Sequence, residues 1–153
     1  MKVLVDTNVL LRWSDADSPR HEECVEAVNL LIDRGCQVCA CSQVLIEYWV
    51  TATRPLDVNG FGLSFAHAER NLAQVRGAFP SLAEPTNMVD RWQQVVAQYR
   101  VMGRQAYDAR IVALMQAHNI AHLITLNADD FARYLGVTPI APSQAESHFP
   151  ASQ

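Results

Sequence analysis

Short aliphatic runs alternate along the chain with longer stretches in which apolar residues recur at helical spacing. The aliphatic runs have the length of buried strands, and Gly, Pro, Asn and Ser residues lie close to their ends. We predict strands at residues 2–5, 37–41, 122–126 and 137–140. The first run stops at Asp6, Thr7 and Asn8, so it delivers polar side chains at its carboxyl end.

The helical pattern predicts a helix after the first strand and five more at 19–34, from Ser42 through Trp49, and at 65–76, 87–99 and 105–117. Pro80 and Pro85 separate two of these helices, which we expect to form an inserted helical hairpin. Residues 53–62 are rich in Pro, Asn and Gly, which predicts an irregular loop.

Strand and helix alternate at both ends of the chain, a pattern typical of α/β proteins. We therefore expect a single α/β domain over residues 1–142. Its central parallel sheet should have about four or five short strands, with helices on both faces. Residues 143–153 should be a flexible tail. Sheets of this kind bind ligands beyond the carboxyl ends of their strands.

The composition indicates a folded protein without a membrane anchor. Half of the residues are hydrophobic and 18% are charged. No apolar run approaches the roughly 20 residues that a bilayer crossing needs. The net charge of −4 gives no general attraction to nucleic acid, so any contact with it must be local.

The four cysteines all lie in the first third of the chain, which indicates a reducing cytoplasm. The spacing Cys36-x-x-Cys39-x-Cys41 lacks a fourth zinc ligand, and strand alternation turns Cys36 away from Cys39 and Cys41. We interpret these residues as buried thiols.

Asp6 is the first candidate for chemistry, because polar residues directly after a buried strand cost desolvation unless something uses them. The alternative is that Asp6 or Thr7 only caps the following helix.

Asp108 opens a helix and shares a side with Ile111, Val112 and Met115, so it should face inward and need a partner. The alternative is pairing with Arg104, four residues earlier.

Glu47 has apolar neighbours in its own helix, although an exposed glutamate would be ordinary there. Three carboxylates from separate elements suit Mg²⁺ or Mn²⁺, hard ions that prefer oxygen ligands.

Four separated segments of the chain resemble the PIN-domain family, and most closely the VapC type of toxin ribonuclease from bacterial toxin-antitoxin pairs. The matching segments are Leu4-Val5-Asp6-Thr7-Asn8-Val9-Leu10, Glu47, Tyr107-Asp108-Ala109-Arg110-Ile111-Val112-Ala113 and Leu123-Ile124-Thr125-Leu126-Asn127-Ala128-Asp129-Asp130-Phe131. Their combination is more specific than any one of them, since an aspartate after a first strand also occurs in phosphatases and receiver domains.

The resemblance implies a catalytic site in which Asp6 and Asp108 bind Mg²⁺ or Mn²⁺ and Glu47 completes an acidic triad. Thr7 would support Asp6 or the scissile phosphate. The fourth polar position of the family falls on Asn127, with Asp130 as the second choice. Because asparagine carries no charge, one-metal catalysis stays open beside two-metal catalysis.

The resemblance also implies RNA cleavage, with tRNA or rRNA as typical targets, a cognate antitoxin protein as partner, and a homodimer. Arg12, Arg104 and Arg110 are candidate contacts for RNA phosphates, since the planar guanidinium group grips phosphate with two hydrogen bonds.

Two other functions were compared with this one. Phosphoryl transfer of the haloacid-dehalogenase kind needs an aspartate where Asn8 stands and a downstream lysine, and the chain has no lysine after Lys2. A receiver domain also needs that lysine. The other alternative is a non-catalytic PIN fold that binds RNA or a protein as a regulator, for which Asn127 is the best argument.

Overall fold

Five short parallel strands form one sheet in the computed structural model, which describes residues 1–151. The strands are β1 (Lys2–Val5), β2 (Gln37–Cys41), β3 (Ser81–Leu82), β4 (His122–Ile124) and β5 (Thr138–Ile140). Their order across the sheet is β3-β2-β1-β4-β5. The central β1 buries Val3, Leu4 and Val5 completely, which explains its unbroken aliphatic run. The predicted α/β class and parallel sheet are confirmed.

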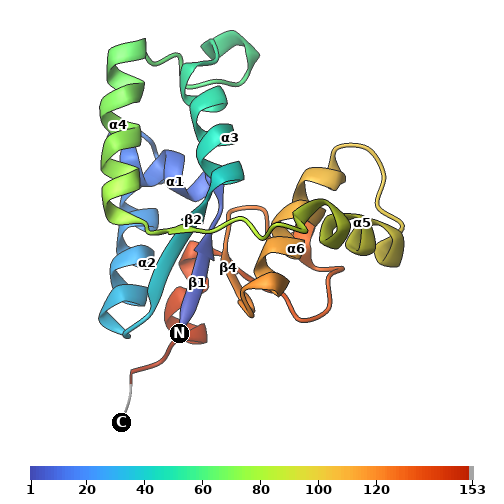
Figure 1. Cartoon of the computed structure of the whole chain (residues 1–153). Coiled ribbons are helices and arrows are strands. Elements are labelled where there is room, and N and C mark those ends of the chain that lie inside the picture. Colours follow the sequence, from blue (N-terminus) through green and yellow to red (C-terminus); the bar gives the residue numbers. More distant parts are fainter. Residues whose placement is uncertain (152–153) are drawn as a thin grey trace.

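Helices cover both faces of this sheet, with α2 on one side and α6 on the other (Figure 1). The helices are α1 (Thr7–Ser14), α2 (His21–Asp33), α3 (Ser42–Thr53), α4 (Phe65–Ala78), α5 (Met88–Tyr99), α6 (Gln105–Ala117), α7 (Ala128–Phe131) and α8 (Ala145–His148), with 3₁₀ turns η1 (Leu56–Val58) and η2 (Pro142–Gln144). Across residues 1–151, none of them combines the length and apolar character that a membrane crossing requires.

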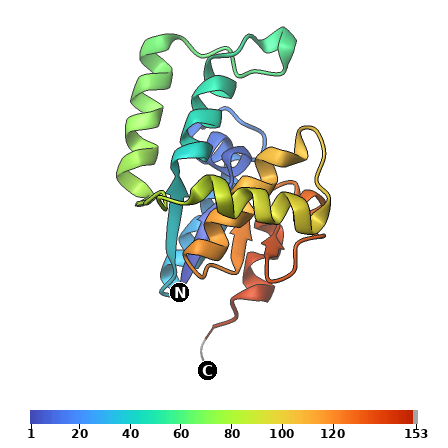
Figure 2. The ribbon, with the colours of Figure 1, turned by 45° about the vertical axis from the view of Figure 1, so that its right-hand side comes forward.

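The expected hairpin between the helices at 65–76 and 87–99 is wrong. α4 packs along α3, whereas α5 packs along α6 on the other side of the molecule (Figures 1 and 2). The segment between α4 and α5 crosses the sheet edge as β3, and the Ala40 amide donates to the Pro80 carbonyl at 3.0 Å. A strand of two residues has no periodic pattern, so the sequence did not reveal it.

The segment after Pro142 is folded through residue 149, where we expected a flexible tail. η2 and α8 pack against α2, and both Ala145 and Phe149 are buried. The Phe149 ring meets His122 edge-on at 5.3 Å, and Arg34 Nε donates to the Phe149 carbonyl at 3.1 Å. Residues 152 and 153 lie outside the described residues.

The four cysteines are free thiols, and all of them are buried in the core. Burial raises the pKa of Cys41 to about 11, which keeps it protonated. This agrees with their interpretation as buried thiols.

Candidate active site

A cleft of about 730 Å³ at the carboxyl edge of the sheet gathers acidic side chains from four elements, including Asp130 of α7. Asp6 follows β1, Glu47 comes from α3 and Asp108 comes from α6, and all three line this cleft. The structure thus brings together the three carboxylates that the sequence suggested. The edge is also the one at which parallel sheets bind ligands.

Asp6 is held by hydrogen bonds to both carboxylate oxygens. Oδ1 accepts from the Thr7 amide at 2.7 Å, so Asp6 does cap α1. Oδ2 accepts from Thr125 Oγ1 at 2.6 Å and from Asn8 Nδ2 at 2.9 Å. Burial raises the pKa of Asp6 and the charge of Glu47 adds to this, while the hydrogen bonds oppose the rise. Asp6 is therefore a helix cap that also points a fixed carboxylate into the cleft.

Asp108 lies half-buried in the first turn of α6 without a partner. Among the described residues, no hydrogen bond or ion pair involves its carboxylate. Burial raises its pKa to about 6, and the charges of Asp130, Asp6 and Glu47 contribute. Arg104 lowers the pKa slightly but forms no ion pair with Asp108. The charge of Asp108 is thus not compensated by the described residues.

Glu47 is oriented by Gln43 and lies close to the Thr7 hydroxyl. Gln43 Nε2 donates to Glu47 Oε1 at 2.8 Å. Thr7 Oγ1 lies 3.4 Å from Glu47 Oε2 and 3.2 Å from the carbonyl of Val44. Because the Thr7 hydroxyl has one hydrogen, it can donate to only one of these two oxygens at a time. The Thr7 backbone amide supports Asp6.

Both candidates for the fourth polar position line the cleft and are exposed. The backbone amide of Asn127 donates to Thr125 Oγ1 at 3.1 Å, so Asn127 lies just past the end of β4. Asp130 lies in the following helix, α7, and its charge is the strongest of those that raise the pKa of Asp108. The role of either residue stays a prediction.

Three arginines line the cleft: Arg12, Arg54 and Arg104. Arg110 lines instead an adjoining groove between α5 and α6, which shares Arg104 with the cleft, and it pairs with Glu84 at 2.8 Å. Arg54 was missed in the sequence. It begins the loop to α4, which folds back so tightly that a Cβ at Gly60 would lie 1.8 Å from the Arg54 carbonyl oxygen.

Thr125 is a second residue that sequence reasoning missed. It is fully buried, and its hydroxyl contacts Asp6 and the Asn127 amide. The available signal was its position directly after β4, the strand beside β1, because carboxyl ends of neighbouring parallel strands meet at one edge.

The PIN-domain family model matches residues 3–136 of the chain. The chain belongs to the PIN-domain family. No curated protein sequence matches this PIN domain.

Solved structures share the fold of this PIN domain. A chain of VapBC2 from Rickettsia felis, bound to a promoter DNA fragment, has a TM-score of 0.71 at 14% identity, covering 92% of this chain and 98% of its own. A chain of DNA-bound VapBC from Salmonella typhimurium has a TM-score of 0.65 at 23% identity, covering 93% and 98%. Mycobacterium tuberculosis VapC20, a toxin that cleaves the sarcin-ricin loop, has a TM-score of 0.61 at 19% identity, covering 85% and 93%.

The side chains in the cleft of this PIN domain fit a hard divalent cation. They offer carboxylate oxygens, and the unpaired charge of Asp108 is one that a cation would compensate. Within residues 1–151, no three acidic, histidine or cysteine side chains form a ready-made metal cluster.

Proposed function

We propose that this PIN domain is a metal-dependent endoribonuclease and the toxin of a toxin-antitoxin pair. The observation that carries the proposal is the meeting of Asp6, Glu47 and Asp108 in one cleft, with at least one carboxylate left uncompensated. Buried like charges destabilise a fold unless a cation neutralises them, so their presence supports a metal-dependent activity.

The reaction is hydrolysis of an RNA phosphodiester bond, with water as the nucleophile. Asp6 and Asp108 would hold Mg²⁺ or Mn²⁺ together with Glu47, and Asn127 or Asp130 would complete the site. The ion, when bound, activates a water and stabilises the charge that develops on the phosphate. Arg12, Arg54 and Arg104 line the same cleft and would bind the phosphates on either side of the scissile bond. These arginines provide the local positive charge that the net charge of −4 does not.

The relatives of this fold support the choice of RNA and of a protein partner. VapC20 cleaves the sarcin-ricin loop, and a toxin-antitoxin complex from Klebsiella pneumoniae contains a chain with a TM-score of 0.61 at 24% identity, covering 89% of this chain and 95% of its own. We accordingly propose a cognate antitoxin as the partner of this chain. The homodimer that the resemblance implies stays a prediction.

Cleavage of a labelled pool of total RNA tests the proposal. Purified protein, freed of any antitoxin, is incubated with the pool in Mg²⁺, in Mn²⁺ and in EDTA. We expect discrete cleavage products with either metal and none in EDTA, and the sequence at the cut ends would identify the target. Absence of products from folded protein in every lane would contradict the proposed ribonuclease activity and favour the non-catalytic regulator, for which the uncharged Asn127 is the argument.

A further inference from the structure

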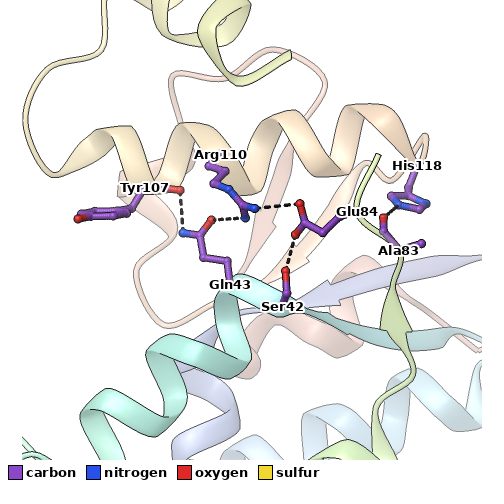
Figure 3. Close-up of polar contacts among 7 residues, drawn as sticks. All are labelled: Ser42, Gln43, Ala83, Glu84, Tyr107, Arg110 and His118. Carbon is purple, nitrogen blue, oxygen red and sulfur yellow. Dashed lines mark hydrogen bonds and ion pairs between the residues drawn. The ribbon is translucent and has the colours of Figure 1, made fainter. Parts of the chain in front are cut away.

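A chain of polar contacts connects Glu47 through Gln43 and Arg110 to Glu84. Figure 3 shows its part from Gln43 to Glu84. Gln43 Nε2 donates to Glu47 Oε1 at 2.8 Å, and Arg110 Nη1 donates to Gln43 Oε1 at 3.1 Å. Arg110 Nη2 pairs with Glu84 Oε2 at 2.8 Å. One carboxylate of the proposed metal site is therefore connected to groups outside the cleft.

The amide of Gln43 has one orientation that satisfies its surroundings. This side chain is 8% exposed, and its Nε2 also donates to the Tyr107 carbonyl at 3.0 Å. Both acceptors of Nε2 are thus oxygens, and the neighbour of Oε1 is a guanidinium group. A turn of the amide by 180° would set oxygen against oxygen and nitrogen against nitrogen, which would lose all three hydrogen bonds. The amide is therefore fixed.

Gln43 joins the two helices that supply Glu47 and Asp108. Glu47 lies one helical turn after Gln43 on the same face of α3. On α6, the contacts of Gln43 are with Tyr107 and Arg110, which flank Asp108 in the sequence. Gln43 thus links the Glu47 carboxylate directly to α6, the helix that carries Asp108.

The segment after β3 holds Arg110 in place. Glu84 Oε1 accepts a hydrogen bond from Ser42 Oγ, at the start of α3, while Oε2 pairs with Arg110. His118, just past the end of α6, contacts the carbonyl of Ala83 at 2.8 Å through Nε2. Arg110 is thus committed to Gln43 and Glu84, which differs from its expected role as a contact for RNA.

We propose that Gln43 is a positioning residue, held by Arg110 and Glu84, which sets Glu47 relative to Asp108 so that the cleft binds a divalent cation. The inference rests on the proposed function and assigns Gln43, Arg110 and Glu84 a part in it without contact to RNA. Groups that orient metal ligands commonly contribute ten- to hundredfold to metal affinity.

Binding of Mn²⁺ to the full chain tests this role. The electron paramagnetic resonance signal of free Mn²⁺ measures how much of the ion is bound. We expect Gln43→Ala to weaken Mn²⁺ binding about tenfold or more. Glu84→Gln, which leaves Gln43 in place, should weaken it about threefold, a smaller part of the same effect. The matched control is Glu23→Gln, which breaks the exposed Arg20–Glu23 ion pair of 2.9 Å outside the cleft. That variant should bind Mn²⁺ as the wild type does.

Two results would overturn the inference, and they are distinguishable. If Asp108→Asn abolishes Mn²⁺ binding while Gln43→Ala and Glu84→Gln stay within twofold of the wild type, the site exists and Gln43 does not position it. If the wild type binds no Mn²⁺, the proposed function fails and the inference fails with it. Melting curves in EDTA show whether Gln43→Ala folds. If Gln43→Ala does not fold, the Mn²⁺ affinity of Glu84→Gln decides whether Gln43 positions Glu47.

Discussion

Cleavage of RNA by the Asp108→Asn variant is expected to be about 100 to 1000 times slower than cleavage by the wild type, the loss typical of one electrostatic contact to a transition state. Asparagine has the shape of aspartate but lacks the charge that would attract the cation. The loss should appear in the rate at saturating RNA, because Asp108 is assigned to the ion and not to substrate binding. Single-turnover cleavage of a labelled target RNA measures it.

The same variant should be more stable than the wild type when no divalent ion is present. Burial raises the pKa of Asp108 from 3.8 to about 6, so above about pH 6 the folded protein carries a charge that destabilises it. Two pKa units correspond to roughly 3 kcal/mol, and solvent screening at this half-buried site reduces the gain to about 1 kcal/mol. The difference in the free energy of unfolding between Asp108→Asn and the wild type should grow as the pH rises from about 4 to 6. It should vanish below about pH 4, where Asp108 is protonated in both the folded and the unfolded wild type.

Asp33→Asn is the matched control for both measurements. Asp33 is exposed at the end of α2, before β2 begins, and so lies at the opposite edge of the sheet from the cleft. It should change neither rate nor stability. If Asp108→Asn cleaves RNA at the wild-type rate, Asp108 is not a ligand of the cation. If the variant loses activity because it unfolds, the result gives no support to Asp108 as a ligand.

Saturating Mn²⁺ is expected to raise the melting temperature of the wild type by about 5–10 °C and to leave that of Asp6→Ala unchanged. An ion present at a hundred times its dissociation constant stabilises the fold by about 2.7 kcal/mol, and one kcal/mol is roughly 2–4 °C for a domain of this size. Asp6→Ala removes a carboxylate that lines the cleft and points into it.

The Asp6→Ala variant should also melt lower than the wild type in EDTA. It loses the cap of α1 and leaves the buried Thr125 hydroxyl without its acceptor, which together cost about 1–3 kcal/mol. The comparison that matters is therefore the shift caused by Mn²⁺ within each variant. An equal shift in both proteins would place the ion outside the cleft, and no shift in the wild type would favour the regulator.

The sequence alone revealed the elements that carry the acidic residues. The aliphatic run that stops at Asp6 predicts a buried strand with a carboxylate at its end, because strands that are buried on both faces of a parallel sheet have such unbroken apolar runs. Asp108 was found because it shares a helix side with apolar residues. In both cases the pattern of apolar residues within one segment is sufficient, and this pattern can be seen in the sequence.

The parts that were missed depend on contacts between distant segments. Thr125 and Gln43 are ordinary polar residues in the sequence, and their roles arise only because β4 lies beside β1 and α3 lies beside α6. Arg110 seemed available to RNA until the structure placed Glu84 next to it. The docking of Phe149 against His122 likewise joins residues far apart in the chain, so no local pattern predicted it.

Crystals grown with Mn²⁺ and measured for anomalous scattering test most directly the claim that carboxylates from three elements bind one cation site. We expect an anomalous peak in the cleft, in contact with Asp6 and Asp108 and reached directly or through water by Glu47. The peak should be lost in Asp108→Asn crystals grown in the same way. An empty cleft in a protein that cleaves RNA with Mn²⁺, or an ion bound only elsewhere on the surface, would contradict the account.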